Sequence, residues 1–401
     1  MKVWKHWIAL GALALCAVPA LAQKKYDVGA SDTEIKLGMA MPYSGPVSSY
    51  GIVGKVNEAY FKMVNDKGGI NGRKVSLISY DDQYTPPRTT EVVRRLVEQD
   101  EVLAVYGNLG SASNAAIMRY MNAKKVPHLF LGVGADRFND PKGAPWTTPY
   151  MPSYEAEGAL YAKNILKTLP GAKIAVLYQN DDFGKDLLKG LKKGLGDKAG
   201  MVVAEASFEV ADPTVDSQII KLQASGADVF VNFATARFAT QAIRKVWDIG
   251  WRPKQQYLTY VSAYVKMTLE PAGLEKSKGI MAMAFFKDAV QPRWANDPAT
   301  QEFLAFMKKY APGEDIHNAA GVYGYGVAQA MEQVLKAAGD DLTRANVLKQ
   351  ATSLKNVSTG MLLPGITLNT SGTDYWPFSS LQLVQFNGKE FEPLGQSIAV
   401  K

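Results

Sequence analysis

The segment GNLGSASN at residues 107–114 places serines and glycines where an apolar run ends. Ser111 has the side chain of a nucleophile, but the G-x-S-x-G motif of a nucleophile elbow is absent, because Asn114 stands where its closing glycine would be. A different chemistry suits the segment better. Ser111 lies where a helix should begin, so its hydroxyl and the free N–H groups of the first turn can hold a carboxylate. Gly107 and Gly110 let the backbone approach such a ligand closely.

The sequence offers few other residues suited to catalysis or metal binding. His128 and His317 have no second His or Cys at ligand spacing, so the sequence predicts no metal site, no cofactor and no histidine base. The pairs Asp81–Asp82 and Asp181–Asp182 are adjacent, which favours roles in turns or helix caps. We therefore expect a binding protein, not an enzyme.

The first 22 residues have the order of a secretory signal peptide. Lys2 and Lys5 precede the apolar segment 7–18, and Ala20-Leu21-Ala22 offers a cleavage site. This predicts export to the periplasm and removal of residues 1–22.

Cys16 is the only cysteine, so the mature chain would have no disulfide and no thiolate site. Leu15 precedes it where a lipoprotein signal needs a small residue, which argues against a lipid anchor. Cleavage also lowers the formal charge from +7 to about +5 without leaving basic runs, so we expect no nucleic-acid partner.

Strand and helix patterns alternate from Glu34 onward. Between apolar runs typical of buried strands, apolar residues recur at helical spacing. The expected strands of the first half are EIKLGMAM (34–41), KVSLIS (74–79), VLAVYG (102–107) and VPHLFLG (126–132). This rhythm predicts a parallel sheet with helices on both faces.

The same rhythm resumes after the proline-rich segment 145–152, whose prolines suit a crossover between domains. The expected strands of this second series are KIAVLY (173–178), MVVAEASF (201–208), DVFVNFA (228–234) and QQYLTY (255–260), and the chain turns helical again after GIMAMAFF (279–286). Helical patterns at 301–350 have no strands of their own and are predicted to return to the first sheet. The predicted lobes are 31–150 plus 286–361, and 151–285 plus 362–401.

Several segments, in this order, resemble the leucine/isoleucine/valine-binding proteins, the type I periplasmic binding proteins of ABC importers. They are SGPVSSYG (44–51), NDKGGINGRKVSL (65–77), YDDQYTP (80–86), VLAVYGNLGSASN (102–114), KVPHLF (125–130) and KIAVLYQNDDFGKDL (173–187). The resemblance covers nearly the whole mature chain. It implies an α/β fold of two Rossmann-like lobes joined by three crossovers, with the ligand in the cleft between them.

The resemblance also implies which residues bind. Ser111 and the backbone at Ala112, Gly132, Val133 and Gly134 would hold the ligand's carboxylate or nearby polar atoms. Aromatic and polar side chains would enclose the rest of the ligand: Tyr50 from the first lobe, and Phe183, Thr235 and Tyr260 from the second.

One departure from the family bears on the ligand. Amino-acid binders pair the ligand's ammonium with an acid of the second lobe, because a desolvated cation needs an opposite charge. Aligned through QYLTYVSAYVKM, that position falls near Val261, and no acid lies between Lys254 and Glu270. An aromatic or other apolar acid suits such a cleft, unless Glu155, Glu157 or Asp181 supplies the charge.

Three functions follow from these patterns. The first is a monomeric periplasmic protein that delivers a small carboxylate to the permease of an ABC transporter, with a hydrophobic amino acid as the alternative ligand. The second is a sensory module of the same fold that recognises an amide. The third, an exported hydrolase acting through Ser111, lacks a catalytic constellation.

Overall fold

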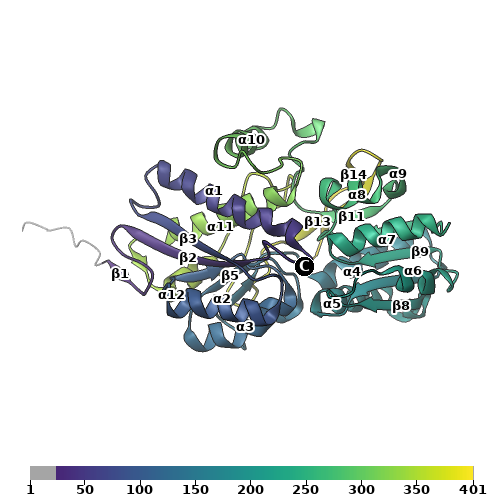
Figure 1. Cartoon of the computed structure of the whole chain (residues 1–401), viewed down its shortest axis with the longest axis horizontal. Coiled ribbons are helices and arrows are strands. Elements are labelled where there is room, and N and C mark those ends of the chain that lie inside the picture. Colours follow the sequence, from purple (N-terminus) through teal and green to yellow (C-terminus); the bar gives the residue numbers. More distant parts are fainter. Residues whose placement is uncertain (1–23, 401) are drawn as a thin grey trace, which may run out of the picture.

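The computed structural model describes residues 24–400, so the predicted signal peptide and Cys16 lie outside the described residues. Two lobes lie side by side, each built on its own sheet (Figure 1). Within residues 24–400, no helix combines the length and the apolar character needed to cross a bilayer.

The first lobe is built on a five-stranded parallel sheet in the order β3-β2-β4-β5-β6. The strands are β2 (Glu34–Met41), β3 (Lys74–Asp81), β4 (Ala104–Tyr106), β5 (His128–Leu131) and β6 (Thr147–Pro149). In β2, alternation gives way to consecutive buried residues, as expected for a central strand covered on both faces. The expected strands at 34–41 and 74–79 are confirmed.

Six helices belong to this lobe. They are α1 (Ile52–Asp66), α2 (Pro86–Glu98), α3 (Ser111–Lys124), α10 (Pro298–Tyr310), α11 (Ala320–Ala338) and α12 (Arg344–Ala351). Helix α10 packs on α1, on the far side from the sheet (Figure 1). Helices α2 and α3 share one apolar cluster with β4, whereas α1 and α11 pack together in another. Helix α1 ends at Asp66 and is followed by Gly68 and Gly69, both at positive φ, and a Cβ at Gly69 would overlap the Arg73 carbonyl. A two-residue pairing of β1 (Lys25–Tyr26) with β12 (Asp341–Leu342) ties the two ends of this lobe together.

The second lobe has a larger, mixed sheet in the order β14-β13-β11-β10-β9-β7-β8, with β15 paired to β13. The strands are β7 (Ile174–Gln179), β8 (Val202–Phe208), β9 (Val229–Phe233), β10 (Gln255–Leu258), β11 (Met281–Ala284), β13 (Ser380–Phe386), β14 (Phe391–Pro393) and β15 (Ile398–Ala399). Strands β7 to β11 are parallel, and the last three join antiparallel. The predicted α/β fold with parallel sheets flanked by helices is confirmed.

Helices cover both faces of this second sheet. They are α4 (Tyr154–Thr168), α5 (Asp182–Leu195), α6 (Asp216–Gln223), α7 (Ala236–Asp248), α8 (Glu270–Ala272) and α9 (Leu274–Ser277). Short turns of helix, named η1 to η5, occupy Ser48–Gly51, Asp136–Phe138, Gly196–Met201, Val265–Leu269 and Pro292–Trp294. Helices α4 and α5 approach closely, because a Cβ at Gly158 or Gly190 would overlap the backbone of the other helix.

The chain passes between the lobes three times: at 150–153, after β11, and between α12 and β13. The second and third crossovers pair with each other. Phe286 bridges Leu362, and the Lys287 N–H donates to the Met361 carbonyl at 2.7 Å. The segment 145–152 is more than a connection, because 147–149 form β6. Its proline fits there because β6 is an edge strand.

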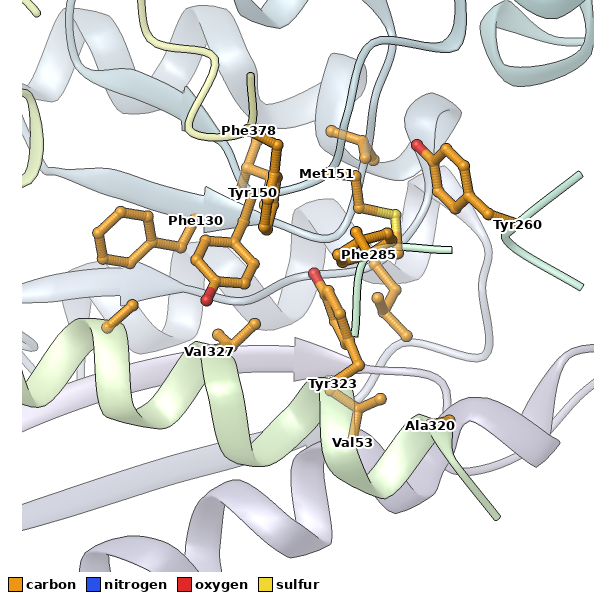
Figure 2. Packing of buried hydrophobic residues seen from close by; sticks show 14 of the residues in the cluster. Val53, Phe130, Tyr150, Met151, Tyr260, Phe285, Ala320, Tyr323, Val327 and Phe378 are labelled. Atoms are coloured by element: carbon orange, nitrogen blue, oxygen red, sulfur yellow. The ribbon is translucent and has the colours of Figure 1, made fainter. Parts of the chain in front are cut away.

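Aromatic side chains from all three crossovers meet in a buried cluster (Figure 2). The Phe378 ring lies between the rings of Tyr150 and Phe285, at centroid distances of 5.5 and 4.8 Å. Tyr150 also packs on Tyr323 of α11 and donates its hydroxyl to the Gly326 carbonyl at 3.1 Å. The three connections are therefore packed into one hinge core.

Candidate functional site

Helix α3 begins at the carboxyl end of β4, and its first residue is Ser111. Gly110 precedes it with φ of 93°, and a Cβ there would lie 2.4 Å from the Tyr84 ring. Only glycine therefore lets Tyr84 pack against the start of the helix. The Ser111 side chain is 1% exposed, and its Oγ has no hydrogen-bond partner. A buried hydroxyl at a helix N-terminus, where the first N–H groups are also free, is suited to hold an anion.

Buried polar side chains brace this turn from below. Asn114 Nδ2 donates to the carbonyls of Gly110 and Asn108, at 2.8 and 3.2 Å. The Asn114 side-chain oxygen Oδ1 accepts from His128 Nε2–H at 2.9 Å. Burial lowers the pKa of His128 to about 3, so this imidazole is neutral at physiological pH. Asn114 and His128 thus fix the backbone that presents Ser111.

Tyr50 connects the two lobes from the opposite wall. Its hydroxyl accepts from the Ala236 N–H at 3.1 Å and donates to the Val261 carbonyl at 3.0 Å. Ala236 is the first residue of α7, so the Tyr50 hydroxyl takes up one of the free N–H groups of that helix. The Tyr50 ring also meets Tyr264 edge-on at 6.4 Å. Burial raises the pKa of Tyr50 to about 12, which keeps the hydroxyl a donor.

These groups surround a cavity of about 40 Å³ between the lobes, here called the interlobe cavity. At ~10–15 Å³ for each water molecule, it has room for about three. Its walls are Pro42, Val47, Tyr50, Tyr84, Leu109, Gly110, Ser111, Gly132, Met151, Tyr154, Phe183, Thr235 and Val261. None of these side chains is charged. Most are apolar or aromatic, and Tyr154 meets Phe183 edge-on at 5.0 Å.

The structure brings five of the sequence-predicted residues together in this cavity: Tyr50, Ser111, Gly132, Phe183 and Thr235. The other four do not line it. Ala112 is exposed on α3, and Val133 is fully buried in the core. Gly134 is packed so tightly that a Cβ would overlap the Pro152 carbonyl, and its own carbonyl accepts from the Tyr154 N–H. Tyr260 donates its hydroxyl to Pro152 O at 2.6 Å.

Sequence reasoning missed two aromatic walls, Tyr84 and Tyr154. Tyr84 follows β3, so the rule that ligands meet the carboxyl ends of parallel strands pointed to it. Its φ of 57° sets the direction of its side chain, which lies beside Gln179 of the second lobe. Tyr154 starts α4 directly after the first crossover, where nothing in the sequence sets it apart.

The acids that the sequence offered as partners for an ammonium are engaged elsewhere. Glu157 is buried under β10 and accepts from the Tyr260 N–H at 2.7 Å, from Thr259 Oγ1 at 2.9 Å and from the Tyr161 hydroxyl at 2.7 Å. Burial raises its pKa to about 8. Two others are also committed: Glu155 pairs with Lys189 and Lys193, and Asp181 caps α5.

Charged groups of the two lobes meet outside the cavity lining. Arg137 and Asp182 form an ion pair across the lobes at 2.9 Å, and the Asp136 N–H donates to the Asp186 carboxylate at 2.9 Å. Burial, with Glu155 and Asp186 nearby, raises the pKa of Asp136 to about 6. Among residues 24–400, no three His, Cys, Asp or Glu side chains gather in a way that would hold a metal ion.

A second and larger cavity, of about 280 Å³, lies at the hinge. Among the described residues, no serine at a helix N-terminus lines this second cavity. Of the residues predicted from the sequence to bind the ligand, only Tyr260 lines it. On chemical grounds the smaller interlobe cavity is the candidate site.

Comparison with known proteins places the chain among binding proteins. A sequence profile described as periplasmic binding protein matches residues 34–390. Leu/Ile/Val-binding protein homolog 7 of Brucella suis is 25% identical over 373 residues, covering 90% of this chain and 89% of that protein.

Two solved structures share the fold. One is a branched-chain amino acid ABC transporter protein from Thermus thermophilus with bound valine, with a TM-score of 0.82 at 15% identity, covering 92% of this chain and 97% of that one. The other is a fatty acid ABC transporter substrate-binding protein from Thermomonospora curvata, with a TM-score of 0.76 at 19% identity, covering 94% and 95%.

Proposed function

The chain belongs to the periplasmic binding protein family, and from that premise we propose that it captures a small carboxylate between its lobes and delivers it to the permease of an ABC importer. The observation that carries this proposal is the Ser111 hydroxyl. It is buried, it has no partner, and it lies at a helix N-terminus in a cavity with no charged side chain. A carboxylate would accept from Ser111 and from the first N–H groups of α3.

The proposed class of ligand follows from the absence of an acidic side chain among the residues that line the interlobe cavity. An α-ammonium buried there would have no acid to pair with, which costs several kcal/mol. A carboxylate on an apolar or aromatic body has no such cost, and Tyr50, Tyr154 and Phe183 supply flat walls for a ring. An aromatic or other apolar monocarboxylate is therefore the proposed ligand.

The two structural relatives illustrate the alternative ligands. The Thermus protein holds valine, which is a zwitterion, and the Thermomonospora protein is a fatty acid binder, whose ligand has no ammonium. A hydrophobic amino acid is thus the second candidate for this chain, and an amide-sensing module is the third. With about 40 Å³ between the lobes, any of these ligands requires the lobes to move apart before it enters.

The decisive comparison is phenylpropanoate against phenylalanine, by calorimetry on protein freed of bound ligand by unfolding and refolding. We expect phenylpropanoate to bind tighter, because the two molecules differ in the ammonium. Tighter binding of phenylalanine or leucine would reject the acid and favour the amino-acid alternative. Tight binding of an amide alone would favour the sensory module.

The carboxylate contact is tested by Ser111→Ala. We expect a loss of about 1.5 to 3 kcal/mol in binding free energy, the range for a charge-assisted hydrogen bond, with the folding stability unchanged. Ser113→Ala is the matched control, since Ser113 is buried in the same turn but does not line the cavity. Equal affinities for the two variants would assign Ser111 a structural role only.

Export is proposed from the sequence of residues 1–22. Expression of the full chain in a Gram-negative host should yield a periplasmic protein that begins at Gln23, as read by mass spectrometry of the intact protein. A retained N-terminus would instead favour an anchored form.

A further inference from the structure

The cavity at the hinge, here called the hinge cavity, is lined mainly by aromatic and apolar side chains from several segments. Tyr264 follows β10, Phe286 and Trp294 belong to the second crossover, Leu363 to the third, and Phe391 to β14. The Tyr264 and Phe286 rings lie nearly parallel, with centroids 6.2 Å apart. At about 280 Å³, the hinge cavity is seven times as large as the interlobe cavity.

Two polar groups in its wall are buried and unpaired. Gln291 is 4% exposed, and its Oε1 has no hydrogen-bond partner. The Trp294 Nε1–H also lacks one. Each unpaired buried group costs free energy, and a ligand that bonds to it would recover that cost. Together they offer one acceptor and one donor among the residues that line the cavity.

The charges in the wall are balanced. Asp288 and Arg293 both line the cavity, and the Arg293 guanidinium donates to the Phe391 carbonyl at 3.3 Å and lies over the Trp294 ring at 5.1 Å. One carboxylate and one guanidinium leave no net charge to attract an ion. The wall therefore favours a neutral molecule with a ring and with hydrogen-bonding groups of both kinds.

The hinge cavity is separate from the interlobe cavity. The two share no lining residue, and the edge-on contact of Tyr50 with Tyr264 lies between them. Tyr260 and Phe285, which also line the hinge cavity, pack beside Met151 of the first crossover in Figure 2. Met151 in turn lines the interlobe cavity, so a layer of side chains divides the two spaces.

We propose that the hinge cavity is a second binding site, which takes a small neutral aromatic amide or alcohol. The ring would lie among Tyr264, Phe286 and Phe391, while the ligand accepts from the Trp294 indole N–H and donates to Gln291 Oε1. Such an occupant satisfies both unpaired groups and fills apolar space that water fills poorly.

Benzamide is the probe for this site, measured by calorimetry on the refolded mature chain. Trp294→Phe and Gln291→Leu each remove one polar group while keeping most of the shape, and each should weaken benzamide binding about fivefold to tenfold. Ala263→Leu, which enlarges a lining residue and removes neither polar group, should abolish binding by filling the cavity. Ser111→Ala is the control for the interlobe cavity and should bind benzamide like the wild type.

Three results would overturn the proposal. They are no binding of benzamide at millimolar concentration, equal binding by wild type and all three hinge variants, and loss of binding in Ser111→Ala. The last would place benzamide in the interlobe cavity. Thermal unfolding of each variant identifies any that fails to fold, and the three hinge substitutions act independently, so one misfolded variant leaves the other two to decide.

Discussion

The Tyr50 hydroxyl gives the sharpest prediction about lobe closure. Tyr50→Phe removes two hydrogen bonds that join the lobes, one with the Ala236 N–H and one with the Val261 carbonyl. In the closed form both backbone groups would be left unpaired, whereas water satisfies them once the lobes separate. The cost therefore falls on the closed form alone, at about 1 to 3 kcal/mol. At 1.36 kcal/mol per factor of ten, the closed population should fall about 5-fold to 150-fold relative to the open one.

Small-angle scattering of the ligand-free protein measures this shift, because an open form has the larger radius of gyration. We expect a larger radius for Tyr50→Phe than for the wild type. Tyr43→Phe is the matched control, since the Tyr43 hydroxyl pairs with Ser79 at 2.6 Å within the first lobe and should leave the radius unchanged. Equal radii for wild type and Tyr50→Phe would refute the argument that this hydroxyl holds the lobes together.

Two further predictions concern stability. Gly110→Ala should lower the free energy of unfolding by about 1 to 3 kcal/mol in urea titrations, because φ is 93° and the new Cβ meets the Tyr84 ring. Gly313→Ala is the control, since the space around Gly313 is open, and it should change the free energy of unfolding little. Similar losses in both variants would contradict this reasoning. Glu157, with its pKa raised to about 8, holds a proton in the folded state that the unfolded chain releases near its ordinary value of 4.5. The wild type should therefore lose stability as the pH rises from 5 through 8, and Glu157→Gln should not show this pH-dependent loss. Urea unfolding at several pH values measures both. Identical pH profiles for the two proteins would show that the Glu157 carboxyl is already ionised in the folded state.

The sequence predicted the alternation of strands and helices well, because parallel strands buried on both faces leave long apolar runs. The β2 segment EIKLGMAM matches its expected bounds at both ends. The short strand β6 was missed, since two threonines and a proline carry no apolar pattern, and neighbouring β5 is what makes them a strand. The capping role expected for the Asp181–Asp182 pair is confirmed, because Asp181 accepts from the Gly184 N–H.

The sequence predicted only some of the residues that line the candidate site. Ser111 and Tyr50 were accessible because each follows a strand end, where parallel sheets place their ligands. The orientation of Tyr260 was not, because it depends on the Pro152 carbonyl, more than a hundred residues away in sequence. The same is true of Tyr84, whose left-handed backbone turns its ring toward the start of α3. Such long-range contacts leave no local pattern in the sequence.

The pairing of the second and third crossovers limits how the lobes can move. Phe286 bridges Leu362, so these two connections behave as one ribbon, and the crossover at 150–153 is the other point of attachment. These two attachments lie side by side in the hinge core and define a line, and rotation about that line is the one soft degree of freedom left to the pair of lobes. Sliding or twisting of one lobe relative to the other would strain one of the two attachments. Little orientational entropy is then lost when a ligand closes the lobes, so more of its contact energy remains as affinity.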